Sequence, residues 1–269
     1  DKAIQTASGR KLARVFEECL SDVPKAEETY RYVLSVEALD VEALTNLDRI
    51  YSSLAQPTEL AQILEQRILA PAEPYELIDL HNRLGQIYEE QLAQPDDAIR
   101  VFRKVFDELD RSNELAIYAL ERVYGQKGAW VDLRAVLERQ LENTGGDTLE
   151  ADIRAKIAHV LAGQLNDVPG AVETWKKVLE LRGEDQEALA ALADLYERLG
   201  QWAELCEVLE RHYDIAPDDV ARVEVLLRRA KLFVEQLGRD DSALDDYNRV
   251  LDIEYGNVHA LYAISEILR

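Results

Sequence analysis

The side chains that could carry acid–base or metal chemistry are, first, the 4 histidines. A metal site needs two or more ligands that converge on one point. The histidines lie in different segments, and none has a second histidine or a cysteine at ligand spacing. They are His81, His159, His212 and His259. The sequence therefore predicts no metal centre and no other cofactor.

Aspartate pairs recur where the chain is expected to turn between helices. Two adjacent carboxylates could do acid–base work, but the same place also holds Ser21-Asp22, and these residues are typical helix N-caps. Gly145-Gly146 is not a phosphate-binding loop, because no Lys-Ser or Lys-Thr follows it. The aspartate pairs are Asp96-Asp97, Asp218-Asp219 and Asp240-Asp241. With no nucleophile beside a base, we predict that the protein is not an enzyme.

Charge limits the partners that the chain can bind. Its 269 residues include 31 basic and 53 acidic ones, for a net charge of -22. Phosphate backbones and anionic membranes would be repelled by such a surface. No apolar run approaches the roughly 20 residues that span a bilayer. We therefore expect neither nucleic-acid binding nor membrane insertion; the alternative reading of the charge is a surface that is simply well solvated.

Two interleaved patterns show which elements position these side chains. The first reads Leu84-Gly85-x-x-Tyr88, then Ala98-x-x-x-Phe102, and its anchor alanines recur at 26, 98, 171 and 243. The second reads Ala188-Leu189-x-x-Leu192-x-x-Leu195-Tyr196, with anchors at 43, 116, 188 and 260. Both series step by 72 or 73 residues, so the repeating unit has about 36 residues and two flavours. Its apolar stripes have helical spacing, and Pro or Gly separates them.

Each unit is therefore predicted to be a helix, a short turn and a second helix. We expect a single array over residues 1–269, with about seven full repeats and a partial eighth. The predicted bounds are 7–40, 41–75, 76–113, 114–149, 150–185, 186–220, 221–256 and 257–269. The chain begins at Asp1 and contains no Met, so we expect an excerpt of a longer or processed protein.

The repeats resemble the tetratricopeptide repeat (TPR) family, whose pattern is roughly Trp-x-x-Leu-Gly-x-x-Tyr, then Ala-x-x-x-Phe, then Pro. The resemblance covers about residues 7–269. The chain is also similar to large bacterial proteins with many such repeats. His81 stands where the family often has Trp. The resemblance implies an all-α, right-handed α-solenoid with a concave face made by the first helix of each repeat.

Two departures from a regular array are visible in the sequence. The first flavour carries one extra residue between Gly85, or its equivalent, and the anchor alanine. Arg229 falls where the other first-flavour repeats have Leu12, Leu84 or Ile157, which suggests an irregular seventh repeat. Small residues such as Gly85 are expected where the two helices of a repeat cross. Aromatic residues such as Phe102 are expected to fill the space between repeats.

The resemblance also implies which residues face the groove. These are positions three before, one after and four after the Gly85 equivalent, and Arg forks there favour carboxylates. The candidates for binding a peptide are Arg10, Arg14, Arg49, Asn82, Gln86, Tyr118, Arg122 and His159. One hypothesis is a groove for an acidic peptide or a chain terminus. The alternative is surface arginines that pair with Glu17, Glu18 or Glu42.

The two cysteines, Cys19 and Cys206, lie five repeats apart in such an array and are expected to be unpaired. Reduced thiols favour the cytoplasm, while a cell-envelope location stays open for an excerpt. The first functional hypothesis is a non-catalytic scaffold that binds a peptide or partner protein on its concave face. The alternatives are a structural array that associates end to end, or a regulatory region of a larger protein that contains an enzyme.

Overall fold

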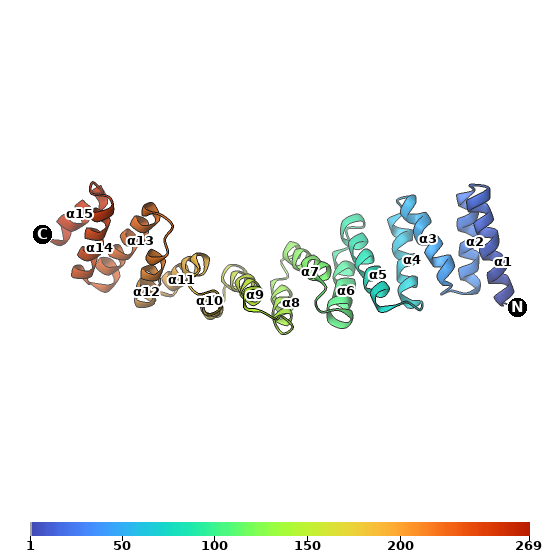
Figure 1. Cartoon of the computed structure of the whole chain (residues 1–269), viewed down its shortest axis with the longest axis horizontal. Coiled ribbons are helices and arrows are strands. Elements are labelled where there is room, and N and C mark those ends of the chain that lie inside the picture. The colour runs from blue at the N-terminus through green and yellow to red at the C-terminus, as the bar shows by residue number, and fades with distance from the viewer. Residues whose placement is uncertain (1) are drawn as a thin grey trace. The chain divides into compact units, whose positions relative to one another are not determined.

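The computed structural model describes residues 2–269, and within that range it contains helices and no strands. The chain forms two compact units, one ending at Ala129 and the other beginning at Trp130. Within each unit, helices that follow one another in the sequence pack together (Figure 1). The prediction of an all-α fold made of helix–turn–helix repeats is confirmed.

The unit that ends at Ala129 contains three complete helix pairs and the first helix of the fourth predicted repeat. Short turns join the two helices of each pair. Its elements are α1 (Lys2–Arg14), η1 (Val15–Cys19), α2 (Val23–Val36), α3 (Val41–Ser53), α4 (Pro57–Leu69), α5 (Pro74–Gln86), η2 (Ile87–Gln91), α6 (Pro95–Lys104), η3 (Val105–Leu109) and α7 (Glu114–Lys127).

The unit that begins at Trp130 starts with the second helix of that fourth repeat, continues with three helix pairs and ends on a first helix. Its elements are α8 (Trp130–Leu141), α9 (Asp147–His159), η4 (Val160–Gln164), α10 (Val168–Arg182), α11 (Gln186–Leu199), α12 (Trp202–Asp214), α13 (Asp219–Leu232), η5 (Phe233–Leu237), α14 (Asp240–Ile253) and α15 (Val258–Ile267). The predicted repeat 114–149 thus contributes one helix to each unit.

A π-helical turn ends the first helix of every first-flavour repeat. These turns are η1, η2, η4 and η5, and they begin at Val15, Ile87, Val160 and Phe233. In η2 the Leu92 N–H donates to the Ile87 carbonyl at 3.0 Å, five residues back instead of four. A π turn takes one more residue than an α turn. It therefore accounts for the extra residue of this flavour, which the sequence shows but does not explain.

The aspartate pairs at the turns have two different roles. Asp22 and Asp218 are N-caps that accept hydrogen bonds from the backbone N–H groups of Lys25 and Ala221. The pairs Asp96-Asp97 and Asp240-Asp241 instead lie in the first turns of α6 and α14. There their charge is favourable near the positive end of the helix dipole. Capping is thus confirmed for Asp22 and for the pair Asp218-Asp219, and it is wrong for Asp96-Asp97 and Asp240-Asp241.

The core of each first-flavour repeat is built around an aromatic side chain on the second helix. Phe102 is fully buried, and its ring lies against the backbone of Gly85 on α5. A Cβ atom at position 85 would come within 2.6 Å of that ring. Gly85 is therefore required by a close approach between helices, as the sequence predicts for this position.

A buried ion pair replaces apolar packing in the seventh repeat. Arg229 on α13 is 7% exposed and Asp246 on α14 is 2% exposed. The Arg229 Nε donates to an Asp246 carboxylate oxygen at 2.6 Å. Glu210 on α12 also contacts Arg229, and Arg249 contacts both carboxylates. The irregularity predicted at Arg229 is thus a charge network that links three helices.

Candidate functional site

The predicted binding residues Arg49 and Arg122 form matched ion pairs in the unit that ends at Ala129. Arg49 on α3 contacts Glu17 of η1, and Arg122 on α7 binds Glu89 of η2 through Nε and Nη2, at 2.5 and 2.7 Å. The glutamate side chains are 12% and 10% exposed, whereas the arginine side chains are 61% and 49% exposed. Each glutamate therefore lies beneath an arginine that faces solvent.

Arg10 and Arg14 on α1 reach towards the beginning of α3. Arg14 Nη2 lies 2.6 Å from a Glu42 oxygen, and Arg10 Nη1 lies 3.2 Å from Asp40, which also caps α3. The alternative reading of the arginines is therefore correct as far as pairing goes, because Glu17 and Glu42 do neutralise them. An arginine in such an ion pair can still donate hydrogen bonds to a ligand, because each guanidinium carries five N–H donors.

A buried hydroxyl group lies near these charges. Tyr30 on α2 is fully buried, and its Oη has no hydrogen-bond partner among the described residues. Burial, with a smaller contribution from Glu17, raises the pKa of Tyr30 to about 12. The hydroxyl is protonated at neutral pH, and its O–H group can donate a hydrogen bond.

The structure separates the uncharged candidates by exposure. Tyr118 on α7 is 59% exposed. Gln86 is half-buried and lines a cavity of about 360 Å³ together with Ser52 and Arg83. Asn82 is buried, and its Nδ2 donates to Asn113, the N-cap of α7, at 3.2 Å. Asn82 therefore links helices, while the other two contribute to the surface.

His159 is not brought together with the other candidates, because it belongs to the unit that begins at Trp130. It lies at the end of α9, where its ring meets Trp175 edge to face at 5.0 Å and its Nε2 lies 3.0 Å from Glu187. At the positions that match Glu17 and Arg49, this unit has Ala162 and Asp194. The glutamate-beneath-arginine arrangement is therefore absent there.

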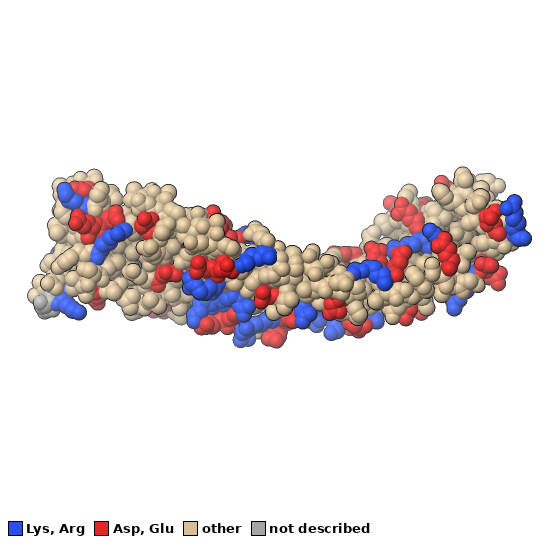
Figure 2. Space-filling view, turned by 180° about the vertical axis from the view of Figure 1, so that it is seen from behind, with Lys and Arg blue, Asp and Glu red and all other residues tan. Residues whose placement is uncertain are grey.

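Basic and acidic side chains alternate on the surface. On the face drawn in Figure 2, blue and red side chains lie next to one another along the molecule. Ion pairs also join helices of successive repeats, such as Arg83 with Asp48 and Arg228 with Glu197. The arrangement can exchange hydrogen bonds with a charged partner, and no single-sign surface dominates the face in view.

Cavities between second helices are a feature that the sequence analysis missed. One of about 470 Å³ lies among α2, α3 and α4, one of about 380 Å³ among α4, α5 and α6, and one of about 460 Å³ among α10, α11 and α12. The only sequence signal for the second of these is His81, which takes the place of a larger residue in the family pattern.

Three further observations concern chemistry and membranes. Over residues 2–269, no three side chains of the His, Cys, Asp and Glu types are grouped so that they could hold a metal ion. In the same range no helix has the length and apolar character needed to cross a membrane. Cys19 and Cys206 are both unpaired, as predicted.

Two solved structures with TM-scores of 0.50 or more support the fold. The complex of Naa15/Naa10 bound to HypK-THB has a chain with a TM-score of 0.60 at 14% identity, over 98% of this chain and 39% of that one. The C-terminal part of a TPR repeat-containing protein from Cytophaga hutchinsonii has a TM-score of 0.50 at 13% identity, over 95% and 99% of the two chains. YrrB, described as a TPR protein with an unusual peptide-binding site, has a TM-score of 0.45 at 16% identity, over 71% and 97%. No curated protein sequence matches the chain.

The helix pairs and the polar face of their first helices define the chain as an α-helical repeat protein. Residues 188–219 and 224–254 each match a family model described as a tetratricopeptide repeat. The chain therefore contains tetratricopeptide repeats, and its helix pairs have the fold of such repeats. Tetratricopeptide repeats are generally non-catalytic modules for protein interaction, so their presence supports a scaffold for protein partners as the functional class.

Proposed function

We propose that the first helices of the unit ending at Ala129 bind an extended acidic peptide of a partner protein, and that Arg49 and Arg122 are its main anchors. The observation that carries this proposal is the matched pair of half-exposed arginines above nearly buried glutamates. Glu89 contacts two nitrogens of Arg122 and Glu17 contacts one nitrogen of Arg49, so each guanidinium has less freedom to lose when a ligand binds. Arg10, Arg14, Gln86 and Tyr118 extend the same face.

The double variant Arg49→Ala/Arg122→Ala is expected to bind such peptides at least about tenfold more weakly, because a hydrogen bond to a charged group contributes about 1.5–3 kcal/mol. A displayed random-peptide library selected on the intact chain should be enriched in Asp and Glu. Fluorescence anisotropy of the selected peptides then gives the affinity for the variant. Binding should also weaken as salt is raised.

The matched control is Lys25→Ala/Arg111→Ala, which removes the same charge from exposed positions outside the first helices. This control should bind as the unaltered chain does. Selection of basic or purely apolar peptides, or equal binding by the Arg49→Ala/Arg122→Ala variant, would contradict the proposal.

End-to-end self-association is a second candidate, favoured by exposed apolar residues on α1 and at the beginning of η1. Leu12 is 49% exposed, whereas its counterparts Leu84 and Ile157 are 1% and 4% exposed. The same holds for Val15, 46% exposed, against Ile87 at 5%. These counterparts are packed against the preceding repeat. A second copy of the chain on α1 would supply equivalent packing, as would a preceding repeat in a longer chain, and the two are separated by whether the mass depends on concentration.

Light scattering over a dilution series tests this candidate, because association must depend on concentration. The expected result is a mass that rises with concentration and a Leu12→Lys variant that stays monomeric. The exposed Leu199, changed in the same way, is the control. A mass that does not change with concentration would exclude self-association as the function.

A further inference from the structure

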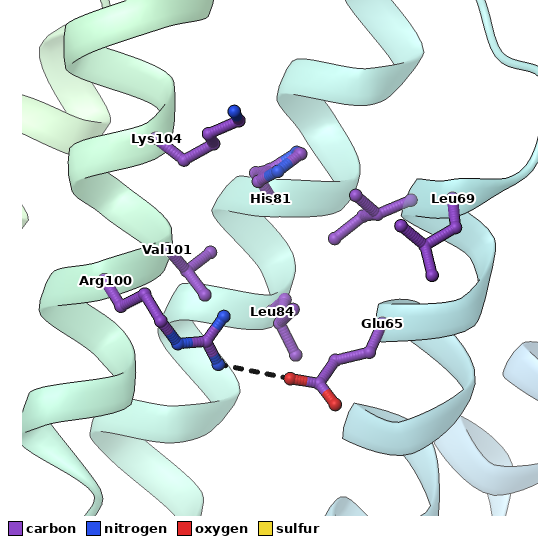
Figure 3. Close-up of a pocket in the computed structure, with 8 residues that line it drawn as sticks. Glu65, Leu69, His81, Leu84, Arg100, Val101 and Lys104 are labelled. Carbon is purple, nitrogen blue, oxygen red and sulfur yellow. Dashed lines mark hydrogen bonds and ion pairs between the residues drawn. The ribbon is translucent and has the colours of Figure 1, made fainter.

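The cavity among α4, α5 and α6 has an apolar interior and a charged rim (Figure 3). It measures about 380 Å³. Leu84 and Val101, which are 1% and 2% exposed, form its interior, and Ile68 and Leu69 form the α4 side. Leu69 is 73% exposed at this cavity. A space of this size accepts one large apolar side chain.

His81 lines the α5 side of the cavity. Its imidazole is smaller than the indole that the repeat pattern often places here, and it is only 5% exposed. The His81 Nδ1 lies 2.7 Å from the Leu77 carbonyl, which can only accept a hydrogen bond, so Nδ1 carries the proton. Burial lowers the pKa of His81, which keeps the ring neutral at pH 7. Its Nε2 is then a hydrogen-bond acceptor at the cavity.

Two cations lie along the α6 side of the cavity. Arg100 and Lys104 are four residues apart on one face of the helix and both line the space. Arg100 contacts Glu65 across the cavity at 3.2 Å and Asp97 at 3.1 Å, both through Nη2. Lys104 contacts Glu108 along its own helix. Further N–H donors on both side chains can bind an anionic group at the rim.

We propose that this cavity binds the C-terminal residue of a partner polypeptide whose last side chain is apolar. The side chain occupies the space above Leu84 and Val101, the terminal carboxylate meets Arg100 and Lys104, and the terminal amide N–H donates to His81 Nε2. A chain terminus fits because it combines one apolar group, one anion and one donor in a single residue. This site lies on the second-helix side, away from Arg49 and Arg122, and does not depend on the acidic-peptide proposal.

The cavity among α10, α11 and α12 has the opposite charge balance and provides a comparison. It also has apolar lining residues, Leu179, Leu192 and Val208, but three glutamates outnumber its two cations, Lys176 and Arg211. A carboxylate is therefore disfavoured there, although the volume is similar. The charge of the lining residues, more than the volume, therefore makes the cavity beside His81 the better site for a carboxylate.

The test uses the synthetic pentapeptide Ser-Gly-Ser-Gly-Leu with a free C-terminal carboxylate, titrated into the full chain with isotope-labelled histidines. The expected result is a saturable NMR shift of the His81 ring with no shift of His212 or His259. The C-terminal amide of the same peptide, and the peptide ending in Ser, should each bind at least tenfold more weakly. His81→Trp fills the cavity and should abolish binding.

Arg100→Gln/Lys104→Gln should weaken binding at least tenfold and keeps the proposal testable if His81→Trp does not fold. Lys176→Gln/Arg211→Gln is the matched control and should bind normally, as should Arg49→Ala/Arg122→Ala. Equal binding of acid and amide, no His81 shift with the free acid at millimolar concentration, or a shift with octanoate alone and none with the peptide would overturn the proposal.

Discussion

Replacing Arg229 by leucine is expected to destabilise the unit that begins at Trp130 by about 3–5 kcal/mol, the usual cost of breaking a buried ion pair. The substitution matches the sequence of other repeats, where Leu84 and Ile157 occupy this position. It nevertheless leaves the Asp246 carboxylate, 2% exposed, without the guanidinium that neutralises it. Arg249, at 3.3 Å, can replace only part of that contact.

Adding Asp246→Val should recover most of the loss. Val101 occupies the position of Asp246 in the third repeat, so the double variant copies the Leu84 and Val101 packing found there. Replacement of a whole buried pair by apolar residues is often neutral or stabilising. Glu210 keeps Arg249 as a partner in the double variant.

Intrinsic tryptophan fluorescence reports the unfolding of this unit alone, for both variants. All 3 tryptophans, Trp130, Trp175 and Trp202, lie at or after its first residue. Denaturant unfolding followed by their emission gives the change in the free energy of unfolding for each variant. A single variant as stable as the unaltered chain, or a double variant no better than the single one, would show that the charge network contributes little.

Phe102→Ala is expected to destabilise the unit that ends at Ala129 by about 3–5 kcal/mol, because a fully buried aromatic ring is removed and a cavity remains. Amide hydrogen exchange, read by mass spectrometry, should show faster exchange across α5 and α6. The control is Tyr32→Ala on α2. Tyr32 is 50% exposed, so its loss should change stability by no more than about 0.5 kcal/mol.

A second substitution tests whether the Phe102 ring and the backbone at Gly85 are energetically coupled. Gly85→Ala in the unaltered chain forces a Cβ atom against the Phe102 ring and should cost about 1–3 kcal/mol. In the Phe102→Ala background the ring is gone, so the same change should cost little. Additive effects of the two substitutions would mean that the ring and the backbone at Gly85 are not coupled.

The helix pairs could be predicted from the sequence because every repeat carries the same signal. Apolar stripes with helical spacing, in two series that step by 72 or 73 residues, leave few alternatives to packed helix pairs. The π turns could not be predicted in the same way. An extra residue can lengthen a turn or widen a helix, and only the hydrogen bond from Leu92 to Ile87 shows which occurs.

The candidate site was predictable only in part. The groove arginines follow from the family pattern, and Glu17 was foreseen as a partner of a surface arginine. The depth of Glu17 and Glu89 beneath Arg49 and Arg122 depends on how neighbouring repeats pack, which no local pattern encodes. The cavity beside His81 was not foreseen because its volume depends on three helices at once.

The alternation of π-turn repeats with ordinary ones determines how the chain could be lengthened or shortened by design. Inserting one repeat would place two copies of the same flavour side by side, in a junction that does not occur within residues 2–269. Inserting or removing four helices, 72 or 73 residues, would reproduce junctions already present. The natural module for engineering this protein is therefore the double repeat, in contrast to the single helix pair suggested by its family pattern.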